Sequence, residues 1–240
     1  MKIKSDVEKI LHRFFYFYSM KFPNNILLPF FILSGIHLWS GQFNYPVIAF
    51  YTKPVLMLLL ASWFYFSTKN YPSSFRNLIL GALLFSFGGD TLLMFVKSKG
   101  EHFFLFGLVS FLIAHLCYLF AFSKYKSQLK GWLKTKPFWA LPLLILLIGF
   151  NFYFLPDVAK EMKVPVLIYS MVITLMTFSA FNLGGKTNSK VFQILFAGAL
   201  LFMFSDMTIA INKFKNPIPY SHIVITVSYT HLTLPTTPYL

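Results

Sequence analysis

Two aspartates, Asp90 and Asp206, lie inside long apolar stretches of this 240-residue chain. The chain has seven acidic residues, and the other five lie in the N-terminal segment or between apolar runs: Asp6, Glu8, Glu101, Asp157 and Glu161. An ionised carboxylate inside a membrane-spanning helix costs at least about 2.5–3.5 kcal/mol, so it is usually retained for a function. Carboxyl groups in such surroundings are suited to proton transfer. The structural alternative is that each bonds to another helix or pairs with a buried lysine.

Other polar residues in the apolar stretches could assist the two acids. Lys53 is the only lysine inside a predicted span, and Tyr169 lies in a later one. His115 and Tyr118 are three residues apart and therefore share one face of a helix. A packing role explains His115 equally well. Four other histidines lie near the ends of apolar runs and are predicted to be interfacial: His12, His37, His102 and His222.

The composition indicates that these residues sit in a membrane. The chain is 57% hydrophobic and 12% charged, with a mean hydropathy of +0.65. These values lie well outside the range of soluble domains, and the apolar runs lack the alternation of strands. We therefore predict an all-α, polytopic transmembrane bundle of about eight helices. The predicted spans are 23–39, 47–66, 75–95, 103–122, 138–154, 164–183 and 191–211, with an eighth that starts near Tyr220.

The positive charges lie between the spans. The net charge is +14, but Lys and Arg fall in short connections, where they meet anionic lipid headgroups, so we expect no nucleic-acid partner. Fourteen Lys and Arg residues fall on one side of the predicted bundle and six on the other. This places the N-terminus in the cytoplasm, with residues 1–22 as a cytoplasmic segment, 23–226 as the transmembrane domain and a bacterial inner membrane as its location.

A five-residue sequence occurs twice, at Gly81–Phe85 before Asp90 and at Gly198–Phe202 before Asp206. The two copies lie on spans four apart, which are therefore parallel, and this predicts an internal repeat of four plus four helices. Alignment on the five residues places Asp206 opposite Gly89. One residue turns a helix by about 100°, so the alignment predicts that the two acids are placed differently in their halves.

A series of motifs resembles the YhhN family of lysoplasmalogenase-like membrane proteins. The resemblance runs from about Lys53 to Thr226 and rests on Lys53-Pro54, Ser86 to Gly89-Asp90, Ala114-His115 to Tyr118, Pro165 to Tyr169, and Gly198 to Phe202 with Ser205-Asp206 and Asn212. It implies an eight-helix enzyme that hydrolyses the vinyl-ether bond of lysoplasmalogens. The products are a fatty aldehyde and a glycerophospho-alcohol.

The reaction that the resemblance implies needs two carboxyl groups. A vinyl ether is hydrolysed by protonation of its alkene carbon, which forms an oxocarbenium ion that water captures. Removal from water and a neighbouring like charge both disfavour the ionised form of a carboxyl group, so Asp90 and Asp206 could divide the acid and base roles. His115, Tyr118 and Tyr169 would orient the acids or the water, and Lys53 or an interfacial lysine would hold the substrate phosphate. The further motif residues are supporting candidates: Ser86, Ser205 and Asn212. We expect no cofactor and no metal.

Two other functions remain open on these residues. Parallel repeats with polar groups inside the bundle also suit a proton-coupled transporter of a small molecule or lipid, with Asp90 and Asp206 as relay sites. A divalent metal held by Asp90, His115 and Asp206 is a third possibility. Release of an aldehyde distinguishes the enzyme from the transporter, and sensitivity to chelators would favour the metal.

The C-terminus departs from the family pattern. The family continues with an apolar, Tyr-rich last helix, whereas Val227 to Thr236 spells Val-Ser-Tyr-Thr-His-Leu-Thr-Leu-Pro-Thr. This string resembles a translated transposase sequencing adapter. We therefore expect residues 227–240 to be non-native and the eighth helix to be cut short.

Overall fold

The computed structural model describes residues 24–43, 45–68, 74–125 and 127–215, and within these ranges the chain is helical, with no strand. The prediction of an all-α fold is confirmed. The predicted N-terminal segment, the eighth helix and the C-terminal tail lie outside the described residues.

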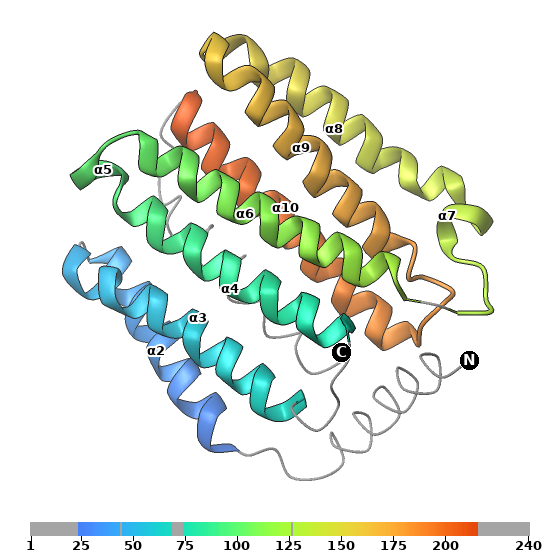
Figure 1. Cartoon of the computed structure of the whole chain (residues 1–240), viewed down its shortest axis with the longest axis horizontal. Helices are drawn as coiled ribbons and strands as arrows, with labels where there is room; N and C mark the ends of the chain where they lie inside the picture. Colours follow the sequence, from blue (N-terminus) through green and yellow to red (C-terminus); the bar gives the residue numbers. More distant parts are fainter. Residues whose placement is uncertain (1–23, 44, 69–73, 126, 216–240) are drawn as a thin grey trace. The chain divides into compact units, whose positions relative to one another are not determined.

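All seven apolar runs in the described part of the chain form helices (Figure 1). The long ones are α2 (Asn24–Gln42), α3 (Pro46–Thr68), α4 (Ser74–Met94), α6 (His102–Ser123), α8 (Leu141–Phe154), α9 (Lys160–Phe181) and α10 (Ser189–Phe214). Short helices connect them: α5 (Val96–Lys99), α7 (Trp132–Thr135), η1 (Pro137–Ala140) and η2 (Leu155–Asp157). The predicted fifth span thus begins as a 3₁₀ turn at Pro137 and continues as α8.

Six of the described helical segments are long and apolar enough to cross a membrane, by length and composition. They contain α3, α4, α6, α8, α9 and α10. The 19-residue α2 is not among them, since Asn24, Asn25 and Gln42 make its ends polar. The chain is a multi-pass membrane protein.

The described residues divide into two compact units, 24–121 and 122–215. In the first unit, α3 packs against both α2 and α4. In the second unit, α9 packs against both α8 and α10. Each unit therefore has a central helix with one neighbour before it and one after it in the chain, and the helix that follows carries the acid.

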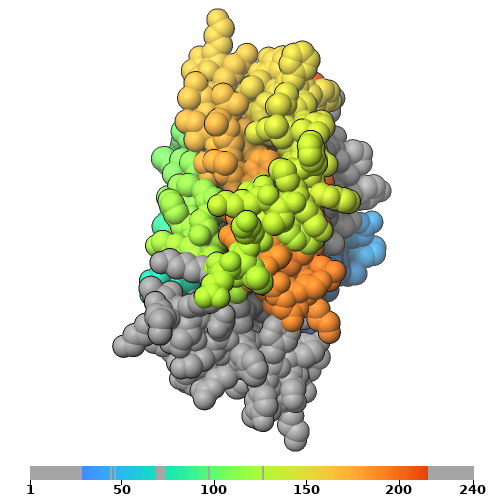
Figure 2. All heavy atoms as spheres, turned by 90° about the vertical axis from the view of Figure 1, so that its right-hand side faces the viewer, coloured from blue at the N-terminus to red at the C-terminus, as the bar shows by residue number. Residues whose placement is uncertain are grey.

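The second unit presents apolar side chains outward, as expected of helices that face lipid. Figure 2 shows one face of this unit, where atoms of α7, α8 and α9 (yellow-green to orange) reach the surface. Large apolar side chains on α8 and the turn before it are exposed: Phe138, Trp139, Ile145, Ile148 and Phe152. Without a lipid environment this much apolar surface would be unfavourable in water.

In the first unit, small residues bring α4 and α6 close together. A Cβ atom on Gly89 would lie 2.5 Å from the Phe111 ring, and one on Gly88 would lie 2.9 Å from Ser110 Oγ. Ser110 also donates a hydrogen bond of 2.7 Å to the Phe85 carbonyl. Glycines at such contacts allow two membrane helices to approach closely. The helix around Asp90 is therefore held by direct packing against α6.

Candidate functional site

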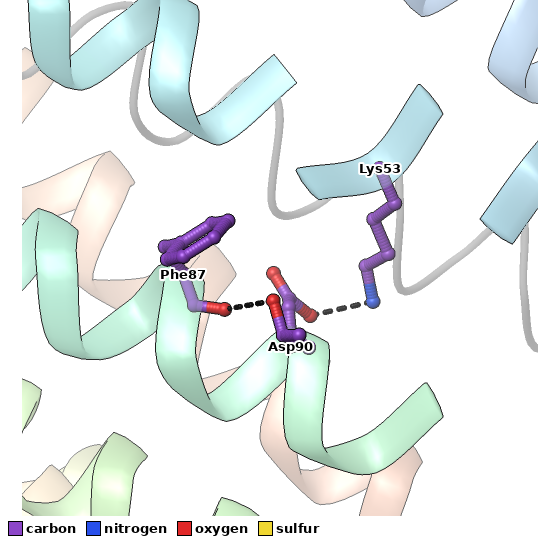
Figure 3. A network of polar contacts seen from close by, with 4 residues as sticks. Lys53, Phe87 and Asp90 are labelled. Carbon is purple, nitrogen blue, oxygen red and sulfur yellow. Dashed lines mark hydrogen bonds and ion pairs between the residues drawn. The ribbon is translucent and has the colours of Figure 1, made fainter. Parts of the chain in front are cut away.

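Asp90 is buried near the C-terminal end of α4 and forms an ion pair with Lys53 of α3. Only 2% of Asp90 is exposed, and Lys53 Nζ lies 2.5 Å from its Oδ1 atom (Figure 3). The next residue, Thr91, bonds back to the Phe87 carbonyl at 2.8 Å. The charge-assisted bond from Lys53 compensates for the removal of the Asp90 carboxylate from water. The pairing with a lysine that the sequence left open is thus present in the first unit, with a lysine that is partly buried.

Asp206 is buried in α10 and accepts a hydrogen bond from Tyr169 of α9. The phenol hydroxyl of Tyr169 donates to Oδ2 of Asp206. Only 8% of Asp206 and 2% of the preceding Ser205 are exposed. A phenol is a neutral donor, so it positions the carboxyl group without supplying a positive charge. The described contact to the second acid therefore differs in kind from the contact to the first.

The two acids occupy equivalent places in their units. Asp90 follows Lys53 by 37 residues, and Asp206 follows Tyr169 by the same number. The acid and its partner in the second unit thus both lie 116 residues after those in the first.

The buried faces of the two acid-bearing helices share this register. The buried residues of α4 are Ile79, Ala82, Leu83, Ser86, Gly89 and Asp90. The corresponding residues of α10 are also all buried: Leu195, Gly198, Ala199, Phe202, Ser205 and Asp206. The register predicted from the repeated five residues, which set Asp206 opposite Gly89, is therefore wrong by one residue. Packing decides which face of a helix is buried. Gly, Ala, Leu and Phe are common in apolar helices, so the same five residues can occur twice at positions that are not structurally equivalent.

In each unit a polar side chain next to the acid's partner ties the central helix to the helix before it. In the first unit, Thr52 Oγ1 lies 2.7 Å from His37 Nδ1 and donates to the Ile48 carbonyl at 2.8 Å. A hydroxyl has one hydrogen, so Thr52 accepts from His37 when Nδ1 carries the ring hydrogen and donates to it in the other tautomer. With 7% exposure, His37 is buried. Its interfacial position stays a prediction, and α2 continues five residues beyond it to Gln42.

The corresponding tie in the second unit joins Ser170 of α9 to Asn151 of α8. Ser170 Oγ lies 2.9 Å from Asn151 Oδ1, and the Asn151 amide donates to the Leu147 carbonyl at 2.8 Å. Thr52, Asn151 and Ser170 were not among the residues predicted from the sequence. Each is a polar residue within an apolar run, and this pattern could have identified them. Thr52 and Ser170 are next to the partners of the acids in the sequence, and Asn151 lies on the helix before α9.

The remaining predicted site residues lie on the same helices. Ser86 is fully buried in α4, four residues before Asp90. His115 and Tyr118 are buried on one face of α6, with 0% and 4% exposure. Asn212 is exposed near the end of α10. Of the supporting residues, the structure brings Lys53 to Asp90 and Tyr169 to Asp206.

The described residues offer no group of three His, Cys, Asp or Glu side chains arranged to hold a metal ion. The two acid sites rely on a lysine and a tyrosine for their described contacts.

Comparison with known proteins assigns the sequence to a family. The model of the YhhN family matches residues 48–231, a range that contains both acids, Lys53 and Tyr169. The chain belongs to the YhhN family. Asn151 and Ser170 also lie in the range that matches the YhhN model, whereas His37 lies before it.

Curated relatives of this YhhN chain include mammalian enzymes. Lysoplasmalogenase TMEM86B of Sus scrofa is 28% identical over 209 residues, which cover 85% of the chain and 80% of the relative. The Homo sapiens TMEM86B is also 28% identical, with the same coverage. Lysoplasmalogenase TMEM86A of Bos taurus is 31% identical over 66% of the chain and 62% of its own length. No solved structure gives a significant match.

Proposed function

We propose that the chain is an intramembrane hydrolase that cleaves the vinyl-ether bond of lysoplasmalogens. The products are a fatty aldehyde and a glycerophospho-alcohol. The similarity to proteins named lysoplasmalogenases over 85% of the chain carries the proposal. Two buried carboxyl groups, each with its own described partner, supply side chains for an acid-catalysed hydrolysis. The membrane provides the lysophospholipid substrate.

Asp90 and Asp206 are the proposed acid/base pair. Protonation of the alkene carbon needs a carboxylic acid, and capture of the oxocarbenium ion needs a carboxylate that accepts a proton from water. General acid and base catalysis contribute roughly 10²–10⁴-fold each. A low-dielectric site also strengthens the attraction between a carboxylate and the developing cation.

The supporting residues follow from the contacts of the two acids. Lys53 holds the Asp90 carboxylate and Tyr169 orients Asp206. Since the Lys53 ammonium is engaged by a carboxylate, an interfacial lysine is better suited to bind the substrate phosphate. His115 and Tyr118 are proposed to orient water or substrate from α6. The distribution of Lys and Arg supports a plasma-membrane enzyme whose N-terminus faces the cytoplasm.

Replacement of each acid by its amide tests the proposal. Asp90→Asn and Asp206→Asn, purified in detergent and supplied with a lysoplasmalogen, are each expected to release aldehyde about 10²–10⁴-fold more slowly than the unaltered chain. Asp157→Asn is the matched control, since Asp157 is a half-exposed acid at the very end of its span and pairs with Lys215 at 2.9 Å. It should keep full turnover. Full turnover in both acid variants, or no aldehyde from the unaltered chain, would contradict the proposal.

A further inference from the structure

We propose that Lys99, in the short helix α5, binds the phosphate of the substrate when the vinyl ether lies at Asp90. The proposal rests on the proposed function and specifies which interfacial lysine holds the head group. Of the two acids it involves Asp90 alone, so all the residues that carry it belong to the first unit. Three observations support it: the exposure of Lys99, the rings that hold its ammonium, and the place of these rings beside the ion pair of Asp90.

Lys99 lies between two spans of the first unit, Ser74–Met94 and His102–Ser123. Its side chain is exposed. A hydrogen bond of 2.8 Å from its amide to the Phe95 carbonyl fixes the backbone of the turn. Lysines just outside a span lie at the level of the lipid headgroups. Lys99 can therefore meet a lipid phosphate without being buried in the hydrocarbon.

Two phenylalanine rings hold the Lys99 ammonium. Its Nζ atom lies 4.8 Å from the centre of the Phe95 ring and 6.0 Å from the centre of the Phe103 ring. The two ring centres are 6.0 Å apart, and the Phe95 ring also meets Phe50 of α3 at 5.5 Å. A ring attracts a cation within about 6 Å of its centre, and an ammonium has three donors. The rings therefore position the charge while donors remain for an anion.

These rings lie beside the ion pair of Asp90. The Lys53–Asp90 pair joins α3 to α4, and the contact of Phe50 with Phe95 joins α3 to the residue that follows α4. Phe50 precedes Lys53 by three residues, about 4.5 Å along α3. Phe95 follows Asp90 by five residues, about 7–8 Å along a helical path. Both steps lead from the acid toward the end of the unit that carries Lys99.

The length of the substrate head matches the depth of the acid. Five covalent bonds separate the ether oxygen of a lysoplasmalogen from its phosphorus, and they span about 6 Å at about 1.2 Å a bond in an extended chain. Asp90 lies four residues before the end of α4, which is also about 6 Å. A vinyl ether at Asp90 therefore brings the phosphate to the level of α5. The ammonium of Lys99 supplies a point charge suited to a phosphate.

The equivalent lysine of the second unit has a different environment. Lys215 follows Lys99 by 116 residues, the interval that also separates the two acids. It pairs with Asp157 at 2.9 Å, and its Nζ atom lies 3.6 Å from the centre of the Tyr153 ring. Within the described ranges, no carboxylate pairs with Lys99. Binding of a phosphate by Lys215 would disrupt an ion pair, whereas binding by Lys99 would not.

Lys99→Gln tests the site in neutral detergent and phosphate-free buffer, where the substrate is the only source of phosphate. The variant should raise KM for a lysoplasmalogen about tenfold with kcat unchanged, as expected for the loss of one charge-assisted hydrogen bond. Lys99→Arg keeps a cation and should recover most of the affinity. A 1-O-alkenylglycerol, which lacks the phosphate, should be hydrolysed by Lys99→Gln and by the unaltered chain with equal kcat/KM.

Two further variants separate phosphate binding from a general effect. Lys215→Gln is the matched control and should leave KM unchanged. Phe95→Leu removes a ring that holds Lys99, so it should raise KM about two- to fivefold, with no further rise when combined with Lys99→Gln.

An unchanged KM in Lys99→Gln, an equal rise in Lys215→Gln, or an equal loss with the substrate that lacks phosphate would overturn the Lys99 site. Failure of the unaltered chain to hydrolyse either substrate would instead overturn the proposed function.

Discussion

The first and second units hold a carboxyl group at the same register but give it different partners. In the first unit Lys53, a cation, pairs with Asp90. In the second unit Tyr169, a neutral donor, bonds to Asp206. Both partners lie on the central helix of their unit, 37 residues before the acid. Equivalent backbone positions thus carry different described contacts, an ammonium at Asp90 and a phenol hydroxyl at Asp206.

Loss of the cation should have the largest effect on stability. Lys53→Met removes the charge but keeps the length of the side chain, and it leaves Asp90 buried without its ion-pair partner. Removal of one member of a buried ion pair typically costs about 3–5 kcal/mol. Thermal unfolding in detergent should show this loss, and Lys53→Met/Asp90→Asn should recover most of it. A single variant as stable as the unaltered chain would contradict the ion pair.

Removal of the phenol hydroxyl should have a smaller effect in the second unit. Tyr169→Phe deletes the donor to Asp206 and keeps the ring, which should cost about 1.5–3 kcal/mol if the carboxyl group is charged and less if it is neutral. Thermal unfolding and aldehyde release measure the two consequences. Tyr153→Phe, at a half-exposed tyrosine of the same unit, is the control. Equal behaviour of the two variants would refute a specific role for Tyr169.

The smallest effect should come from Gly89, the residue before Asp90. Gly89→Ala places a Cβ atom 2.5 Å from the Phe111 ring, and such overpacking typically costs about 1–3 kcal/mol. Ser205, the residue of α10 equivalent to Gly89, already carries a side chain. Gly149→Ala is the control, since a Cβ atom there meets nothing within 4 Å. A neutral Gly89→Ala would contradict the close packing of α4 on α6.

Most of the described fold could be predicted because hydropathy and helix length are coupled in a membrane. A helix that crosses about 30 Å of hydrocarbon needs about 20 apolar residues, and such runs are visible one at a time. The less regular runs were harder to bound. The span that contains Pro142 starts as a 3₁₀ turn at Pro137, and α2 extends past its predicted end to Gln42. Local composition does not determine where a helix packs or stops.

The sequence by itself determined the class of the protein, the family resemblance and the two intramembrane acids, because each depends on residue type and order along the chain. Only the tertiary structure decided which residues contact those acids. Lys53 and Tyr169 reach Asp90 and Asp206 from helices that pack alongside, and His37 and Asn151 brace those helices from one helix further back. Packing also showed which residues of α4 and α10 are equivalent, because the buried residues of a helix are those on the face that meets its neighbours. Repeated apolar residues alone do not specify that face.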